Sequence, residues 1–357
     1  MSRPRLDPRT PLSELHVHLG AAVTPAIMWG IAHAQGIRLP TKDYWEFRDL
    51  ITVRRRRRSF DAYLQLFHWT ELIQSSPLAV ERSVYEVIGG AYRKNNVTRL
   101  ELRFNPMKRN RGGEQDLDHI IAAAVRGMDR AVLEYPTARA GLILCLDRAF
   151  SRELNEIIAG KAIAWRSRGV VAIDIAGPVV DGFRFADYTE IYDACRRAGL
   201  GLTVHAGETG GADEVREALE ALEPDRIGHG VRSADDPSVM AMLRERGTVL
   251  EVCPGSNLHT GVLDSYQDVQ RVVRALVDNR VRFTISTDGP EMLRLYLRDE
   301  LNMLMRHSIL SLDEVHRVIE VGVEASFLDG SGAIGAPGRA ARTQENGGAP
   351  VHAEVLS

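Results

Sequence analysis

Eight short apolar runs, separated by longer amphipathic stretches, constrain the fold of this chain more than any other feature. Alternating strands and helices indicate parallel strands joined by right-handed crossovers. Eight such units favour a closed barrel over an open doubly wound sheet, so we predict an α/β fold, a (β/α)8 TIM barrel. The predicted strands are Glu14–Leu19, Thr98–Phe104, Gly141–Leu146, Val170–Ile175, Gly201–His205, Arg226–His229, Thr248–Cys253 and Val281–Ser286.

One barrel accounts for most of the 357 residues, because α/β barrels exceed 250 residues as single domains. We assign residues 1–328 to this domain. A long insert after the first strand, about Thr24 to Asn96, is predicted to form a helical lid over the barrel mouth. Residues 329–357 are rich in Gly, Ala and Pro and lack apolar periodicity, which predicts a flexible tail.

Charge and cysteine content exclude several classes of protein. A net charge of −3 argues against nucleic-acid and membrane partners, which select strongly basic surfaces. The start of the chain lacks an apolar signal segment, and no run approaches 18 apolar residues. We therefore expect a cytoplasmic protein with a small-molecule partner. Three cysteines, Cys145, Cys195 and Cys253, cannot form a disulfide framework and are interpreted as small buried apolar residues.

Titratable side chains follow four of the predicted strands, where barrel active sites form. Side chains alternate faces along a strand, so His16 and His18 point the same way. Together with His205 and Asp288 they offer three nitrogens and one oxygen, a set suited to a zinc-like divalent metal. The strand-end segments are His16-Val17-His18, His205-Ala206-Gly207-Glu208, Gly228-His229-Gly230 and Ser286-Thr287-Asp288-Gly289.

Each of these segments also has a purely structural interpretation. An isolated His-x-His pair is often a surface pair, and a histidine between glycines, such as His229, is often structural. Asp288 precedes Pro290, which is typical of a helix N-cap. The position of all four segments at predicted strand ends is what favours a common site.

The sequence resembles the adenosine deaminase family of the amidohydrolase superfamily. The resemblance covers about Leu12 to Pro290 and rests on the segments SELHVHLGAA, LELRFNP, AIDIAG, TVHAGE, RIGHG, EVCPGSNLHTG and ISTDGPEM. It implies a (β/α)8 barrel that holds one zinc ion per chain and hydrolytically removes the 6-amino group of a purine. By position it implies the zinc ligands His16, His18, His205 and Asp288, the proton donor Glu208, the water-orienting His229, and Gly177, whose backbone N–H meets the purine edge.

The implied residues suit the chemistry of deamination. Zinc lowers the pKa of bound water toward about 7, which supplies a nucleophile. A carboxylic acid such as Glu208 can protonate a ring nitrogen, and His229 and Asp288 can act on the water. The other zinc deaminase signature, His-x-Glu with Pro-Cys-x-x-Cys, is absent from the chain.

Two positions depart from the family pattern. Gly20 stands where typical members carry an acidic residue that contacts the sugar, and Gly289 stands where they carry a second aspartate that bonds the purine ring. Pro178 follows Gly177 where an acidic residue is common. Lost buried acceptors change selectivity strongly, so we expect a poor adenosine deaminase with a better substrate elsewhere.

The predicted insert contains two further features. The run Arg54–Arg58 is interpreted either as a solvated surface or as a lid that meets an anionic substrate group. Seven aromatic residues are interpreted either as helix packing or as the wall of an apolar pocket: Tyr44, Trp45, Phe47, Phe60, Tyr63, Phe67 and Trp69.

These observations predict a zinc-dependent hydrolytic deaminase, in the enzyme class EC 3.5.4. Its substrate would be adenosine, a modified 6-aminopurine nucleoside of, for example, the aminodeoxyfutalosine type, or a related heterocycle, with release of ammonia. Two alternatives keep the same fold. One hydrolyses another C–N bond, and the other is a non-catalytic metal-binding protein.

Overall fold

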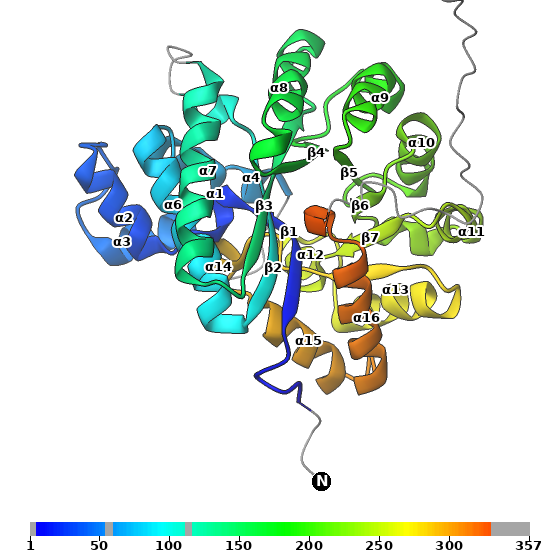
Figure 1. The fold of residues 1–357 in the computed structure, drawn as a ribbon. Helices are drawn as coiled ribbons and strands as arrows, with labels where there is room; N and C mark the ends of the chain where they lie inside the picture. The colour runs from blue at the N-terminus through cyan, green and yellow to red at the C-terminus, as the bar shows by residue number, and fades with distance from the viewer. Residues whose placement is uncertain (1–4, 54–59, 111–115, 330–357) are drawn as a thin grey trace, which may run out of the picture.

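A computed structural model describes residues 5–53, 60–110 and 116–329. At its centre, eight parallel strands pair in sequence order, as Figure 1 shows. All eight predicted strands are confirmed, with ends that differ by up to two residues. They are β1 (Leu12–His18), β2 (Val97–Phe104), β3 (Arg139–Asp147), β4 (Val170–Ala176), β5 (Gly201–Ala206), β6 (Arg226–His229), β7 (Val249–Val252) and β8 (Phe283–Ile285).

The first and last strands meet and nearly close the barrel. Beyond the end of β8, Asp288 forms an isolated parallel bridge with Val17 of β1. The His18 amide donates to the Asp288 carbonyl, and the Asp288 amide donates to the His16 carbonyl, both at 2.9 Å. The TIM-barrel prediction is confirmed, and its seam runs through three of the predicted metal ligands.

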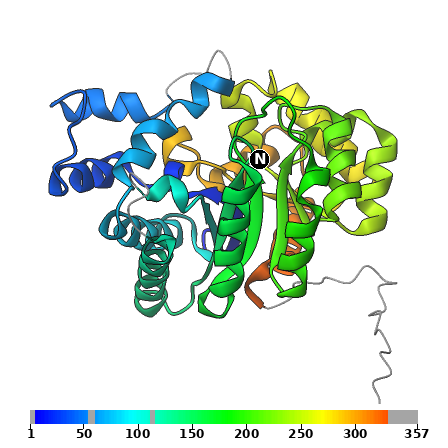
Figure 2. The ribbon, with the colours of Figure 1, turned by 90° about the horizontal axis from the view of Figure 1, so that it is seen from above.

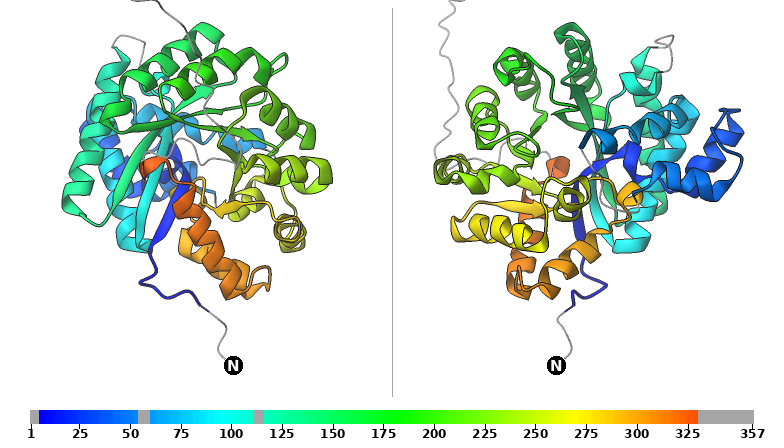
Figure 3. Two further views of the ribbon diagram at one scale, coloured as in Figure 1. Left: turned by 45° about the vertical axis from the view of Figure 1, so that its right-hand side comes forward. Right: turned by 180° about the vertical axis from the view of Figure 1, so that it is seen from behind.

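Helices surround the strands in the ring that Figures 2 and 3 show from two sides. Most begin where a side chain accepts a hydrogen bond from a first-turn amide, as Ser151 and Asp236 do. The long helices of the ring are α6 (Pro77–Asn95), α7 (Leu117–Glu134), α8 (Arg152–Ala164), α9 (Thr189–Arg197), α10 (Ala212–Leu222), α11 (Pro237–Arg246), α13 (Tyr266–Asp278), α15 (Leu297–Arg306) and α16 (Leu312–Glu324). Short helices α1 (Leu19–Ala22), α12 (Pro254–Thr260) and α14 (Pro290–Leu293) follow β1, β7 and β8.

The insert after β1 is shorter than predicted. It consists of α2 (Pro25–Ala34), α3 (Tyr44–Ile51), α4 (Phe60–Leu64) and α5 (Phe67–Ile73). Helix α6, which the prediction included, packs on α7 and β2 as part of the barrel. Helices α2 and α3 project to one side (Figure 1), held together by Trp29 and Phe47, whose ring centroids lie 5.2 Å apart.

The last described residues lie against the barrel. Asp329, assigned to the tail by sequence, forms ion pairs with Arg99 at 2.7 Å and Arg139 at 2.5 Å. Residues 330–357 lie outside the described part of the chain, so the flexible tail stays a prediction. No helix among the described residues is long and apolar enough to cross a membrane.

Candidate active site

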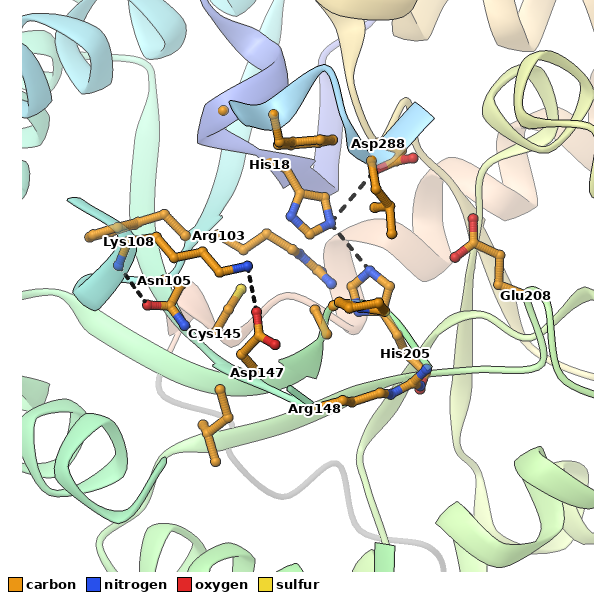
Figure 4. A pocket seen from close by; sticks show the side chains of 18 of the residues that line it. His18, Arg103, Asn105, Lys108, Cys145, Asp147, Arg148, His205, Glu208 and Asp288 are labelled. Carbon is orange, nitrogen blue, oxygen red and sulfur yellow. Dashed lines mark hydrogen bonds and ion pairs between the residues drawn. The ribbon is translucent and has the colours of Figure 1, made fainter. Parts of the chain in front are cut away.

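The four predicted metal ligands converge at one end of the barrel, as Figure 4 shows for three of them. His18 Nε2 lies 3.2 Å from His205 Nε2 and 3.5 Å from Asp288 Oδ1. His16 Nε2 lies 3.8 Å from Asp288 Oδ1. Residues far apart in sequence therefore place three imidazole nitrogens and a carboxylate oxygen around one point.

Two buried carboxylates fix the orientation of the histidine rings. Glu251 Oε2 lies 2.7 Å from Nδ1 of His16, and Asp174 Oδ2 lies 3.0 Å from Nδ1 of His205. The Arg103 guanidinium contacts both carboxylates, at 2.6 and 2.9 Å. With Nδ1 engaged, each imidazole turns Nε2 toward the shared point, an arrangement typical of metal-binding histidines.

The positive charges around Asp174 and Glu251 keep both carboxylates ionised. Burial alone would raise their pKa values. The neighbouring His205 and Arg103 nevertheless hold the pKa of Asp174 below its ordinary value, and Arg103 and Arg226 do the same for Glu251. Burial lowers the pKa of His16 and His18 well below the ordinary value, so both rings are neutral near pH 7.

This donor set fits a divalent metal such as zinc. His16 Nε2 is fully buried, and among the described residues it has no hydrogen-bond partner. Two nitrogens that each lie about 2.0–2.1 Å from one zinc ion at a tetrahedral angle are separated by roughly 3.4 Å, close to the 3.2 Å between His18 and His205. Neutral imidazoles are the form that binds metals.

A second group of potential ligands shares His16. A ring nitrogen of His16, a ring nitrogen of His229 and the Cys253 sulfur lie within 4.8 Å of one another. Burial raises the pKa of Cys253 well above its ordinary value, and the thiol donates to the Glu251 carbonyl at 3.5 Å. The group that contains His18 and His205 is favoured because Asp288 Oδ1, 3.5 Å from His18 Nε2, adds a carboxylate ligand to it.

Glu208 and His229 lie beside the ligand set and face each other, with Glu208 Oε1 3.6 Å from His229 Nε2. Burial and the nearby Asp288 carboxylate raise the pKa of Glu208 well above its ordinary value, which favours the protonated acid. The Asn257 amide nitrogen lies 3.1 Å from His229 Nδ1. A donor at that nitrogen leaves the proton of the neutral ring on Nε2, pointing toward Glu208 and the cavity.

A cavity of about 400 Å³ opens above these residues. It is large enough for a small-molecule ligand. Five residues of α4 and α5 line one wall: Tyr63, Leu64, Phe67, His68 and Glu71. No residue of α2 or α3 lines it, so among the described residues of the insert the predicted cover comes from α4 and α5.

Some aromatic residues of the insert line the cavity, and others pack between helices. Tyr63 and Phe67 line the cavity. Phe47 is buried in helix packing, whereas Trp45 is 61% exposed. Trp69 packs against the core, and Tyr44 lies edge-on to Trp29. The side chain of Phe60 and the run Arg54–Arg58 lie outside the described residues.

The three glycines predicted to bind substrate differ in position. Gly20 and Gly177 line the cavity. The φ angle of Gly177 is +92°, and a side chain there would meet Asp147 within 3.0 Å. Gly289 is not among the lining residues, and a Cβ atom there would lie 2.8 Å from Ala21 and 3.3 Å from the Tyr63 hydroxyl. Its role in substrate binding stays a prediction.

Several residues of the site were not predicted as site residues. Arg103, Asp174, Glu251 and Asn257 lie inside the very segments on which the resemblance rests. A signal for the first three was the charge inside an otherwise apolar strand run, where an unpaired polar group would be costly, whereas Asn257 lies in α12 and carries no such signal. Lys108, Arg109 and Asp147 also line the cavity, and only the fold brings them there.

Comparisons with known proteins agree with this geometry. The family model described as adenosine deaminase matches residues 11–333. An adenosine deaminase of Clostridium kluyveri is 30% identical over 317 residues, covering 89% of each chain.

Two solved structures share the fold. A Burkhoderia ambifaria amidohydrolase with bound Zn has a TM-score of 0.77 and 23% identity, covering 90% of this chain and 87% of its own. Arabidopsis ADAL complexed with GMP has a TM-score of 0.76 and 22% identity, covering 90% and 93%. On the family match and the C. kluyveri relative, the chain belongs to the adenosine deaminase family and is a hydrolase of class EC 3.5.4.

Proposed function

We propose that this protein is a zinc-dependent deaminase that hydrolyses the exocyclic C–N bond of a 6-aminopurine nucleoside, nucleotide or related heterocycle. One observation carries the proposal. A carboxyl group that burial keeps protonated, Glu208, lies 3.6 Å from the His229 imidazole, beside the histidines that would bind the metal. Hydrolytic deamination uses this combination of acid, polar partner and metal ligands.

His16, His18, His205 and Asp288 would hold one zinc ion per chain. Zinc, when bound, makes water acidic enough to act as a nucleophile near neutral pH. The Zn-containing B. ambifaria amidohydrolase and the preoriented imidazoles of His16 and His205 support this assignment.

Glu208 would act on the purine ring, and His229 would act on the attacking water. Glu208 donates its proton to the ring nitrogen next to the amino-bearing carbon, which makes that carbon electrophilic. His229 Nε2–H donates a hydrogen bond to the attacking water, and Asp288 is the neighbouring acceptor for the water's proton. The water oxygen bonds the carbon as one water proton passes to Asp288, which passes it to the exocyclic nitrogen, so that the C–N bond breaks and ammonia leaves. The remaining hydroxyl proton passes to Glu208, while the ring nitrogen keeps the proton it received and the oxygen remains as a ring carbonyl.

The cavity walls would recognise the rest of the substrate. The backbone N–H of Gly177 would meet the purine edge, where a positive φ lets the chain pass close to a ligand. Gly20, without a side chain, leaves the adjoining part of the cavity to Phe67 and Arg109. The GMP bound to Arabidopsis ADAL is consistent with a purine in such a cavity.

Ammonia release from a substrate panel, with zinc analysis of the same sample, tests the proposal. The panel contains adenine, adenosine, 5′-modified adenosines and adenosine 5′-monophosphate, with cytosine and a cyclic amide as tests for another C–N bond. We expect ammonia from at least one 6-aminopurine and about one zinc per active chain. Turnover of the cyclic amide alone would favour the other hydrolase, and zinc without any turnover would favour a binding protein.

A further inference from the structure

Glu208 lies on a short segment after β5, and the backbone of that segment decides where its carboxyl group points. The Oε1 atom is buried and has no hydrogen-bond partner in the part of the chain that the structure describes. His229 Nε2 lies 3.6 Å from it, which is too long for a hydrogen bond. The position of this acid therefore depends on what holds the backbone of residues 205–208.

Two charged side chains hold two peptide groups of that backbone. Arg148 Nη2 donates a hydrogen bond to the His205 carbonyl, and Glu214 Oε2 accepts the Gly207 amide at 2.7 Å. Arg148 Nη2 also lies 3.2 Å from Glu214 Oε1. Hydrogen bonds that involve an ionised group are stronger than neutral ones. The guanidinium and the carboxylate therefore form one ion pair that binds the chain directly before Glu208.

Arg148 is itself held in place by two neighbouring strands and two aromatic rings. It directly follows β3, and its amide donates to the Ala176 carbonyl at the end of β4 at 3.0 Å. Its guanidinium carbon lies 5.5 and 5.6 Å from the ring centroids of Phe183 and Phe185, distances at which a ring attracts a cation. Figure 4 shows Arg148 extended toward His205. A buried side chain with these contacts can fix the backbone that it touches.

Glu214 lies in the first turn of α10, and two glycines make room for its contact with the backbone. Gly207 has a φ angle of +67°, which side chains other than that of glycine rarely permit. A Cβ atom at Gly210 would clash with Glu214 Oε2. A side chain at position 210 would therefore displace the carboxylate from the Gly207 amide.

An ion pair suits a proton donor better than a lone arginine would. Burial and the Asp288 carboxylate raise the pKa of Glu208, whereas Arg148 lowers it and Glu214 raises it. Arg148 without a partner would favour the ionised form of Glu208, and the charge of Glu214 opposes that effect. The guanidinium can therefore hold the backbone while Glu208 stays protonated.

We propose that Arg148 and Glu214 are positioning residues for the proton donor, because their ion pair fixes the backbone that carries Glu208. The inference rests on the proposed function, since that function assigns the proton transfer to Glu208. A general acid acts within about 2.6–3.2 Å of the atom that it protonates. A misplacement of about 1 Å can cost roughly a hundredfold in rate, so the ion pair would affect turnover without touching the reacting atoms.

Kinetics of variants test the inference, on the zinc-loaded full chain with the best purine of the substrate panel. Glu214→Ala should lower kcat about tenfold to a hundredfold, while zinc content and affinity for the deaminated product stay near the wild-type values. Glu214→Gln keeps an oxygen that can accept the Gly207 amide, so it should recover most of this loss. Arg148→Met should behave like Glu214→Ala. The double variant should lose no more than either single variant, because the two residues act as one pair.

Asp225→Ala is the matched control. Asp225 Oδ2 accepts the Leu202 amide at 2.9 Å at the start of β5, so this change removes the same kind of bond from the other end of the same strand. It should lower stability but leave kcat at the wild-type level. A comparable loss of kcat in Asp225→Ala would show that any weakening of β5 impairs turnover, and it would overturn the inference. An equal loss in Glu214→Gln and Glu214→Ala would do the same.

Crystal structures of the zinc-loaded wild type, Glu214→Ala and Glu214→Gln give a readout that does not depend on turnover. We expect the Glu208 carboxyl group to be displaced or disordered in Glu214→Ala and to keep its wild-type position in Glu214→Gln. An unmoved Glu208 in Glu214→Ala would overturn the inference. A wild type that releases no ammonia from any purine would instead contradict the proposed function, and the position of Glu208 in Glu214→Ala would then decide on the ion pair alone.

Discussion

At the scale of single residues, His229 and Asp288 adopt a backbone conformation that residues other than glycine rarely adopt. Their φ angles are +60° and +63°, in the left-handed region. Each such residue costs on the order of 1–3 kcal/mol and persists only where its surroundings hold it. Asn257 contacts the His229 ring, and Ser256 donates to Asp288 at 2.6 Å. The strain therefore falls on Asp288, a proposed metal ligand, and on His229, which lies beside the proposed ligands.

Replacement of Glu208 by glutamine tests its role as proton donor. Glu208→Gln preserves the shape of the side chain but removes the acidic proton. General acid catalysis contributes typically about 10²–10⁴-fold, so kcat should fall by that factor while zinc content stays at the wild-type level. Glu220→Gln, an exposed position on α10, is the control. Turnover near the wild-type rate in Glu208→Gln would show that Glu208 is structural.

The site could be predicted in part because reactive side chains follow the ends of several predicted strands. His16, His205 and Asp288 occupy positions where a parallel barrel must bring side chains together. The contacts of Arg103 and Arg109 could not be predicted, because each depends on which residue of another element lies opposite. Alternation along β2 places Arg103 on the face opposite Leu102 and Phe104, but it does not show that Arg103 bridges Asp174 and Glu251.

At the scale of elements, periodicity located the eight strands but not the boundary of the insert. Helices α2 to α6 each bury apolar side chains. Periodicity shows that a helix has a buried face, whereas the partner of that face depends on tertiary packing. The insert was therefore predicted to reach Asn96, although α6 packs on the barrel.

A buried carboxyl group links α15 to α12 and makes stability depend on pH. Glu300 Oε2 accepts the Gly255 amide at 2.7 Å. Burial, with a contribution from Asp299, raises the pKa of Glu300 from its ordinary value near 4.5 to about 7. Between these values unfolding releases a proton, because Glu300 ionises only when it is exposed. Stability should therefore fall as pH rises from about 4.5 to 7, by on the order of 3 kcal/mol.

Chemical denaturation across this pH range measures the effect. Glu300→Gln is neutral at every pH and can still accept the Gly255 amide, so its unfolding free energy should lack this decline. The difference between wild type and Glu300→Gln should grow in favour of the variant up to about pH 7 and then level off. Glu320→Gln, at an exposed position of α16, should follow the wild type. A constant difference would mean that Glu300 titrates normally.

At the scale of the whole molecule, a chain of buried charges joins the two ends of the barrel. Arg226 donates to Glu251 at 2.7 Å and to Glu101 at 2.6 Å. Glu101 in turn accepts the Phe327 amide, and Arg226 donates to the Ala325 carbonyl. The same Glu251 orients His16. The segment that closes one end of the barrel therefore connects through paired charges to the proposed metal ligands at the other end.

Zinc binding should stabilise the whole barrel against unfolding. The proposed ligands come from β1, β5 and the segment after β8, so one ion would join the barrel seam to the opposite wall. A ligand present at 1,000 times its Kd stabilises the folded state by roughly 4 kcal/mol, and we expect Tm to rise by several degrees with zinc and to fall with a chelator. His16→Ala should lose this zinc-dependent shift and bind less than one zinc per chain. His316→Ala, at an exposed histidine of α16, should keep both. If His16→Ala retained the full shift, the ion would bind elsewhere, and the assignment of these four ligands would be wrong.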